Sequence, residues 1–348
     1  MKLSACLIVK NEAENLAKTL PVLAQGVDEL IILDTGSTDQ TVPVAQSFGA
    51  KVFHCTWKND FAAARNESLK HASGDWLLWI DADEFISADD LKQLNQELSL
   101  TKDTACCVAL FESPLGQCEK KSGYQRVKVF KNGLGYHFIR PINEQLVDQN
   151  NQVIAGPEIP VAIYHWGKDL GEKKMTEKRE RYVALYSQAL EARPGDAYFH
   201  FLLANNLNEL KRLPEALDHY VQASKYTNDQ GLICQTMEKI ADLLLRLKQL
   251  SQAAMVAEQL LALEPNNIPA RNVLASVNLV NGRTEAAVKL LLEVLDLKTD
   301  GAITDFYQAK FMPCFLLSKA YQLKGEADKA QFYAKQAAQL APKIRGIN

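Results

Sequence analysis

The sequence predicts an α/β domain with a doubly wound sheet, followed by an all-α domain built from helical repeats. Two observations in the 348-residue chain predict this organisation: short apolar runs alternate with helical patterns in the first half, and one spacing of small residues recurs in the second half. Alternating strands and helices with short connections are typical of βαβ units, whereas repetition at a fixed period is typical of helical solenoids. We expect the two halves to meet near residue 170.

Composition and charge are those of an ordinary globular protein, with 47% hydrophobic and 23% charged residues. The 39 Lys and Arg residues against 42 Asp and Glu residues give a net charge of −3, which removes the main argument for a nucleic-acid binder. No apolar run approaches the roughly 18 residues that span a bilayer, and the N-terminus lacks the layout of a signal peptide. Seven cysteines without a CxxC pair fit reduced thiols, so we expect a cytoplasmic protein.

Compact apolar runs are expected to form the buried strands of a parallel sheet. They cover Ser4–Val9, Glu29–Leu33, Val52–Cys55 and Trp76–Ile80. Helical patterns fall between them, over roughly Glu12–Gln25, Thr41–Phe48 and Phe61–His71. Gly49 and Gly74 stand where glycine commonly ends a helix.

After Asp83 the pattern changes and favours an antiparallel extension of the sheet. A helix is expected to begin within Ser87–Asp90, with a carboxylate as its cap. Further runs look strand-like and have no long helix between them. These runs are Thr104–Phe111, Tyr124–Phe130, Glu144–Val147 and Val161–His165.

The second half repeats one spacing of small and apolar residues. The pattern starts in turn at Ala204, Ala241, Ala275 and Ser318. In each copy small or apolar residues follow after 12, 16 and 19 positions, and the copies lie 37, 34 and 43 residues apart. The pattern resembles tetratricopeptide repeats, whose period is about 34 residues, and a non-repeating helical bundle is the alternative. We expect insertions around Thr227–Gly231 and Leu297–Ile303.

These patterns divide the chain into an α/β domain over residues 1–170, a linking helix over 171–197 and a repeat domain over 198–348.

Within the first domain, Asp34–Asp39 follows the second predicted strand and shares its Asp-Thr-Gly-Ser letters with the catalytic loop of aspartic proteases. That chemistry needs two such carboxylates sharing a proton, and the chain has one copy. A carboxylate at the end of a parallel strand can instead accept a hydrogen bond from the base or ribose of a nucleotide. A simple capped turn is the alternative interpretation.

Asp81 and Asp83 follow the predicted strand Trp76–Ile80 and would reach the same edge of the sheet. Two carboxylates at positions i and i+2 of extended backbone can flank a divalent ion already carried by a diphosphate, because Mg²⁺ and Mn²⁺ favour oxygen ligands. A lone Asp-X-Asp is usually only a surface turn. Its place after a buried strand, 47 residues beyond Asp34, makes it a more specific indication.

Together these pieces resemble the family 2 glycosyltransferases, which are inverting enzymes with the Rossmann-like GT-A fold. They stand in the order of that family: Ser4–Val9 with Lys10-Asn11-Glu12, then Asp34–Asp39, Asp60–Asn66 and Trp76–Glu84. The resemblance covers about residues 1–167. It points to a bacterial branch that often carries tetratricopeptide repeats and includes lipopolysaccharide-core sugar transferases and bacteriocin peptide glycosyltransferases.

The resemblance implies a role for each segment in binding a nucleotide sugar. Asn11 and Glu12 would belong to the donor-site loop. The loop with Asp34, Ser37 and Asp39 would bind the nucleotide, with Asp34 facing the uracil or the ribose.

The same resemblance implies which residues bind the diphosphate and which bind the metal. Arg65 would bind pyrophosphate oxygens through its planar guanidinium, with a surface salt bridge as the alternative. Asp83 would bind the metal, and Asp81 would hold the ribose or the water shell of the metal. His165 would be a further metal ligand or a donor to the diphosphate, and a structural role is equally open.

An inverting transfer also needs a general base that takes the proton of the acceptor. Relatives in this branch often have His-Glu before an apolar strand, where this chain has Asn143-Glu144. Glu144 is therefore the candidate base, with an exposed strand carboxylate as the alternative.

The expected function is transfer of a hexose or N-acetylhexosamine from a UDP-sugar, with Mn²⁺ or Mg²⁺ as cofactor. The acceptor would be a peptide or protein, or a lipopolysaccharide or other surface glycan, and the repeats would recognise it or join a homodimer. The alternative is a repeat scaffold whose α/β domain is an inactive nucleotide binder. The complete set of Asp34, Arg65, Asp81 and Asp83 favours the enzyme. A dehydrogenase is disfavoured, because the first strand does not lead into a GxGxxG turn.

Overall fold

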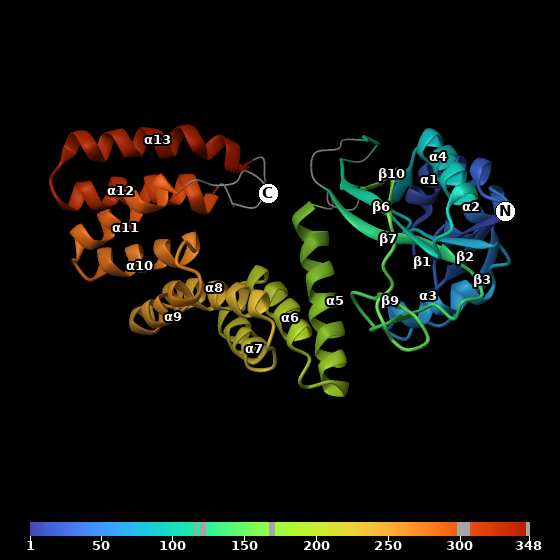
Figure 1. Cartoon of the computed structure of the whole chain (residues 1–348), viewed down its shortest axis with the longest axis horizontal. Helices are drawn as coiled ribbons and strands as arrows, with labels where there is room; N and C mark the ends of the chain where they lie inside the picture. Colours follow the sequence, from blue (N-terminus) through green and yellow to red (C-terminus); the bar gives the residue numbers. More distant parts are fainter. Residues whose placement is uncertain (115, 119–122, 167–170, 298–306, 346–348) are drawn as a thin grey trace. The chain divides into compact units, whose positions relative to one another are not determined.

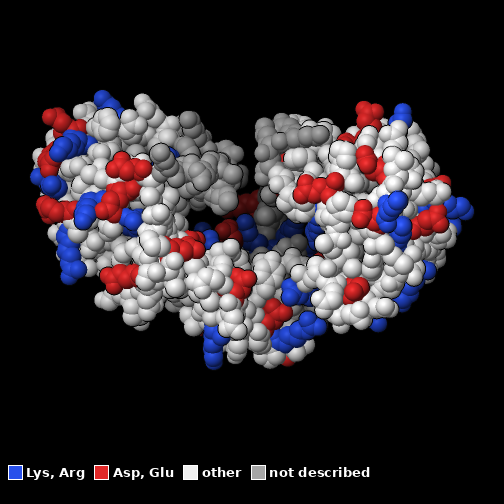
Figure 2. Space-filling view, in the orientation of Figure 1, with Lys and Arg blue, Asp and Glu red and all other residues white. Residues whose placement is uncertain are grey.

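The computed structural model describes residues 1–114, 116–118, 123–166, 171–297 and 307–345. It divides into two compact units, Met1–Met175 and Thr176–Asn348 (Figure 1). The first unit is a mixed sheet with helices and the second is helical, so the expected fold class is confirmed. Acidic and basic side chains are interspersed over the visible face of each unit (Figure 2), in keeping with the net charge of −3.

An eight-stranded sheet forms the centre of the first unit, in the order β3-β2-β1-β4-β7-β6-β10-β5. The strands predicted first in the sequence pair in parallel. They are β1 (Leu3–Val9), β2 (Glu29–Asp34), β3 (Lys51–His54) and β4 (Trp76–Trp79). The carboxyl ends of β2, β1 and β4 therefore meet at one edge of the sheet, which we call the carboxyl edge.

The remaining strands agree with the expected antiparallel extension in part. They are β5 (Glu84–Ile86), β6 (Ala105–Glu112), β7 (Gly123–Lys131) and β10 (Glu158–His165). β7 runs antiparallel to β4 and β6, but β10 runs parallel to β6. A separate pair joins β8 (His137–Ile139) to β9 (Gln145–Val147). The sequence did not reveal β5 or β8, which have three residues each.

Helices cover both faces of the sheet. On one face, the large apolar core includes residues of α1 (Ala13–Gly26), α2 (Thr41–Ser47) and α4 (Ala88–Leu100). On the other face, a second core joins α3 (Phe61–Lys70) to β8 and β9.

Two expectations about helix ends are corrected. α4 is capped by the Ser87 hydroxyl, which accepts from the Asp90 amide at 3.0 Å, and not by a carboxylate. Gly49 lies at a φ of +77° after α2, as expected of a helix end. Gly74 lies beyond α3, and a Cβ there would stand 2.6 Å from the Ser4 hydroxyl, so close packing requires this glycine.

Most of α5 (Gly171–Ala192) belongs to the second unit, which continues as helix pairs and confirms the repeats. The described pairs are α6 (Ala197–Glu209) with α7 (Leu213–Lys225), α8 (Gln230–Arg246) with α9 (Leu250–Leu263), α10 (Ile268–Val280) with α11 (Thr284–Asp296), and α12 (Met312–Leu323) with α13 (Ala327–Arg345). A π-helical turn, Tyr307–Phe311, precedes α12. Within the described ranges no helix is long and apolar enough to span a membrane.

The recurring small residues are buried, as the repeat pattern predicts. Ala204, Ala241 and Ala275 have no exposed surface. The exception is Ala334 on α13, which is exposed because the described part of the chain has no later helix to cover it. The first expected insertion partly lengthens α8, which has 17 residues against 13 in α6. The second expected insertion, Leu297–Ile303, lies outside the described residues except for Leu297.

At the opposite edge of the sheet, Glu29 joins three segments. Its carboxylate accepts from the Ser4 hydroxyl at 2.6 Å, from the Lys51 ammonium at 2.7 Å and from the Ser73 amide at 2.8 Å. Its side chain is 8% exposed. Burial by itself would raise the pKa of this carboxyl, but the hydrogen bonds lower it to about 2.

We therefore expect Glu29→Gln to lower the free energy of unfolding at pH 7 by about 2 kcal/mol, because hydrogen bonds to a charged group are lost. A folded pKa of about 2 lies below the ordinary 4.5, so this stabilisation is complete above pH 4.5 and disappears as the pH falls through 2. Urea unfolding of both proteins between pH 7 and 2 measures the difference. Glu14→Gln, at an 83% exposed carboxylate on α1, is the control with little expected effect. A difference that stays constant on acidification would contradict the assignment.

Candidate active site

Loops from three adjacent strands meet at the carboxyl edge. Asn11 and Glu12 follow β1, Asp34–Asp39 ends β2 and continues beyond it, and Asp81–Glu84 follows β4. Because β2, β1 and β4 are neighbours in the sheet, motifs that are far apart in the sequence lie side by side.

Hydrogen bonds join the first two loops into one unit. The Asn11 amide donates to the Ser37 hydroxyl at 2.8 Å, and the Glu12 amide donates to the Thr41 hydroxyl at 2.7 Å. The Thr41 amide in turn donates to Asp39 at 3.0 Å. Four of the predicted donor-site residues are thus brought together.

Asp34 turns its carboxylate into its own loop. Both oxygens lie within 3.2 Å of the Ser37 amide, and one also accepts from the Gly36 amide. His54 Nδ1 lies 3.4 Å from the same carboxylate, whose side chain is 4% exposed. Burial opposes ionisation, but the hydrogen bonds lower the pKa of the Asp34 carboxyl. The geometry is that of a capped turn, with little carboxylate surface open to a base or ribose.

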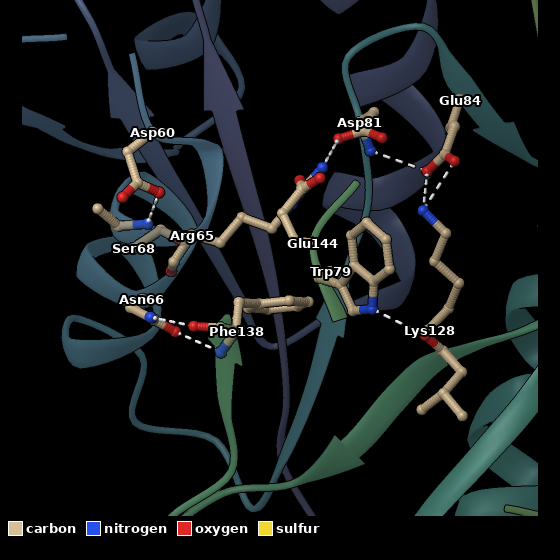
Figure 3. Close-up of polar contacts among 12 residues, drawn as sticks. Asp60, Arg65, Asn66, Ser68, Trp79, Asp81, Glu84, Lys128, Phe138 and Glu144 are labelled. Atoms are coloured by element: carbon tan, nitrogen blue, oxygen red, sulfur yellow. Dashed lines mark hydrogen bonds and ion pairs between the residues drawn. The ribbon is translucent and has the colours of Figure 1, made fainter. Parts of the chain in front are cut away.

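Arg65 lies at the centre of a buried ion-pair network (Figure 3). Its Nε donates to Glu144 Oε1 at 2.6 Å, and its Nη2 donates to Asp81 Oδ1 at 2.8 Å. The side chains of Arg65 and Glu144 are 7% and 9% exposed, so neither a surface salt bridge nor an exposed strand carboxylate describes them. Burial alone would lower the pKa of Arg65, but the two carboxylates raise it. Burial would likewise raise the pKa of Asp81, and Arg65 lowers it.

Contacts between α3 and β8 hold this network in place. The Asn66 side chain donates to the Phe138 carbonyl at 2.8 Å and accepts from the Phe138 amide at 2.7 Å, as Figure 3 shows. The Phe61 amide donates to the Pro141 carbonyl at 2.8 Å. The first turns of α3 therefore fix the loop that carries Glu144.

Lys128 and Glu84 form a second buried pair that sequence reasoning missed. The Lys128 ammonium lies 2.7 and 2.6 Å from the two Glu84 oxygens, and the side chains are 0% and 2% exposed. Lys128 stands at a register shift between β6 and β7, where a bulge can re-aim a side chain. The Glu84 carboxylate also accepts from the Asp81 amide at 2.9 Å, so the pair fixes the backbone of the aspartate motif. No specific indication in the sequence pointed to Lys128, because the same strand also carries Arg126 and Lys131.

The aspartate motif is a turn and not the extended backbone that we expected. The Glu84 amide donates to the Asp81 carbonyl at 3.0 Å, which closes the turn. Asp81 consequently contacts Arg65, whereas Asp83 contacts His165. The two carboxylates therefore have different partners.

Asp83, His165 and Glu112 form a third cluster. His165 Nε2 lies 3.1 Å from Asp83 Oδ2, and its Nδ1 lies 3.1 Å from Glu112 Oε2. Strand pairing places His165 opposite Glu112 on β6 and opposite Glu84 on β5. Burial alone would lower the pKa of His165, but the two carboxylates raise it to about 9. Sequence reasoning missed Glu112, because the register of β10 on β6 has no local pattern.

Asp83 and His165 offer a divalent cation one carboxylate and one imidazole whose donor atoms converge. Among the described residues, no group of three or more His, Cys, Asp or Glu side chains is arranged to hold a metal. The pair therefore fits a cation such as Mn²⁺ only where phosphate oxygens and water supply the other ligands.

In the metal-free chain we expect His165 to titrate near pH 9 and Glu112→Gln to lower that pKa by about one unit, since one of two carboxylates is removed. Because the folded pKa lies above the ordinary 6.5, the stabilisation by these ion pairs is complete below pH 6.5 and is lost as the pH rises through 9. An NMR titration of the imidazole in EDTA measures both values. A wild-type pKa near 6.5 would show that the ion pairs do not form.

Comparisons with known proteins agree with this architecture. A model of glycosyl transferase family 2 matches residues 4–156, and models of the tetratricopeptide repeat match residues 183–229, 239–302 and 313–344. The N-terminal part of the chain therefore matches glycosyl transferase family 2, and its C-terminal part matches the tetratricopeptide repeat.

Two similar curated proteins are each named for one of these two parts. The chain is 35% identical over 211 residues to a TPR repeat-containing protein of Synechococcus elongatus, a match that covers 57% of this chain and 50% of the relative. It is 24% identical over 250 residues to the SPbeta prophage-derived glycosyltransferase SunS of Bacillus subtilis, covering 69% of this chain and 58% of the relative. The chain thus spans about half the length of these relatives. The crystal structure of S. aureus TarS 1–349 in complex with UDP-GlcNAc is 17% identical, covers 83% of this chain and 91% of that chain, and has a TM-score of 0.41.

Proposed function

We propose that the chain is an inverting glycosyltransferase that moves a hexose or N-acetylhexosamine from a UDP-sugar to a peptide, protein or surface-glycan acceptor. The observation that carries the proposal is the convergence of Arg65, Asp81 and Glu144 in one network beside Asp83. This network lies at the carboxyl edge, where open α/β sheets bind their ligands. The family 2 domain supports sugar transfer, and seven free thiols support a cytoplasmic location.

The donor would lie across the loops of the carboxyl edge. Asp83, with His165 beside it, would hold Mn²⁺ or Mg²⁺, and the cation would neutralise charge on the diphosphate. The other donor-site candidates would border the nucleotide: Asn11, Glu12, Asp34, Ser37, Asp39, Arg65 and Asp81.

Glu144 would take the proton of the acceptor. A general base must come within about 2.6–3.2 Å of the atom whose proton it accepts. One Glu144 oxygen already accepts from Arg65, so the acceptor would approach the other oxygen. Arg65 would thereby fix the direction of the base.

The tetratricopeptide repeats would recognise the acceptor or join two copies of the chain. Large apolar side chains are exposed along them, among them Tyr198, Met255, Val280 and Leu323. Such side chains suit either an extended peptide or a second protomer. Light scattering of the full chain distinguishes a dimer from a monomer.

A scaffold with an inactive α/β domain is the second candidate. Two observations favour the scaffold. Arg65 and Glu144 already bind each other, and the Asp34 side chain is buried in its own loop. A screen of UDP-sugars for hydrolysis by the full chain in Mn²⁺ separates the candidates. Release of UDP supports the enzyme, whereas nucleotide binding without release of UDP supports the scaffold.

Asp83→Asn is expected to weaken UDP binding in Mn²⁺ by roughly 10- to 100-fold, because it removes a charged oxygen ligand. Calorimetry with UDP, with and without EDTA, measures this loss. Asp89→Asn, at an exposed aspartate in the first turn of α4, is the matched control and should bind UDP normally. Donor affinity that is unchanged in Asp83→Asn and insensitive to EDTA would rule out the metal assignment.

Glu144→Gln is expected to retain UDP affinity while UDP-sugar turnover falls by roughly 10²–10⁴. The amide keeps an oxygen that can accept from Arg65, but it cannot take a proton. Glu158→Gln, at an exposed position on β10, controls for the loss of one negative charge. Near-normal turnover by Glu144→Gln would eliminate Glu144 as the base.

A further inference from the structure

Three cationic side chains lie against one indole ring at the carboxyl edge. The Lys128 ammonium lies 3.5 Å from the centre of the Trp79 ring, the Arg65 guanidinium carbon 4.3 Å and the Arg126 guanidinium carbon 4.7 Å. The Trp79 indole donates to the Val127 carbonyl at 2.9 Å, which fixes the ring. The three charges therefore surround a rigid centre.

The protein pairs two of these cations internally. Arg65 binds Asp81 and Glu144, and Lys128 binds Glu84. The side chains of Arg65 and Lys128 are 7% and 0% exposed. Arg126 is half-buried, and within the described ranges no carboxylate lies at ion-pair distance from it. Its charge is thus the one in this cluster still open to an anion.

Strand pairing places Arg126 beside the aspartate motif. β7 pairs with β4 from Lys131 opposite Trp76 to Val129 opposite Leu78. β7 runs antiparallel to β4, so the residues of β7 before Val129 lie toward the carboxyl end of β4, where the motif begins. The charge of Arg126 is close enough to contribute, after Arg65 and Lys128, to the lowered pKa of the Asp81 carboxyl.

We propose that Arg126 binds the diphosphate of the nucleotide-sugar donor and that Arg65 is a positioning residue for Glu144 and Asp81. The inference rests on the proposed function. A guanidinium without a carboxylate partner can direct two parallel N–H groups at phosphate oxygens. Arg65 would first have to release two ion pairs in a buried position, which leaves carboxylates unpaired.

The role follows from where charge develops during transfer. The bond between the anomeric carbon and the diphosphate oxygen breaks, and its electron pair stays on that oxygen. The nucleophilic atom of the acceptor forms the new bond to the anomeric carbon, and its proton passes to Glu144. Arg126 stabilises the negative charge left on the departing diphosphate.

The test compares UDP with uridine, which lacks the phosphates, on the full chain in Mn²⁺. Arg126→Gln should weaken UDP binding in calorimetry by about 10- to 100-fold and leave uridine binding, followed by NMR, unchanged. Arg126→Lys keeps the charge but not the two-pronged geometry and should lose affinity to a smaller extent. The matched control is Lys131→Gln on the same strand, whose ammonium lies 5.5 Å from the Trp76 ring at the start of β4 and which should change neither affinity.

The outcomes separate this inference from the function on which it rests. If the wild-type chain binds no UDP, the proposed function fails. If it binds UDP and Arg126→Gln binds it equally well, the assignment of Arg126 is wrong and the proposed function stands. Equal weakening of UDP and uridine also overturns the assignment, because the effect then does not depend on phosphate. Arg126→Lys decides the matter should Arg126→Gln fail to fold by circular dichroism.

Discussion

The buried guanidinium of Arg65 joins two carboxylates from distant parts of the chain, Asp81 and, 79 residues away, Glu144. Both Arg65 nitrogens in these bonds face an oxygen within 2.8 Å, and the Trp79 ring covers one face of the guanidinium, so burial of the charge is compensated. Loss of the guanidinium would leave two carboxylates without their cation, which typically costs about 3–5 kcal/mol for a buried pair. The geometry of the carboxyl edge therefore depends on this one side chain.

The Lys128–Glu84 pair complements that network through the backbone. Burial lowers the pKa of the Lys128 ammonium and the Glu84 carboxylate opposes this, while the indole of Trp79 adds a cation–π contact. The Glu84 carboxylate also accepts from the Asp81 amide, and the Asp83 carbonyl accepts from the Trp166 amide at 2.8 Å. The aspartate motif is thus held at both ends by groups that need not touch substrate.

Sequence reasoning succeeded where the determinant is local. The strands β1 to β4 and the helices between them follow from apolar runs and periodicity, and the convergence of Asp34, Asp81 and Asn11 follows from parallel strands ending at one edge. It failed where the determinant is the pairing of distant strands. The parallel direction of β10 and the contact of His165 with Glu112, 53 residues away, arise from such pairing. The inward orientation of Asp34 was missed because backbone amides decide it.

The turn at the aspartate motif divides the candidate site into two clusters and is itself the segment that connects them. Asp81 belongs with Arg65 and the candidate base, whereas Asp83 belongs with His165. Extended backbone at this point would place both side chains on one face, and both would then compete for the same cation. Since the turn gives each carboxylate its own partner, a cation at Asp83 need not break the ion pair that positions Glu144. The same short segment can therefore hold the donor on one side and orient the base on the other.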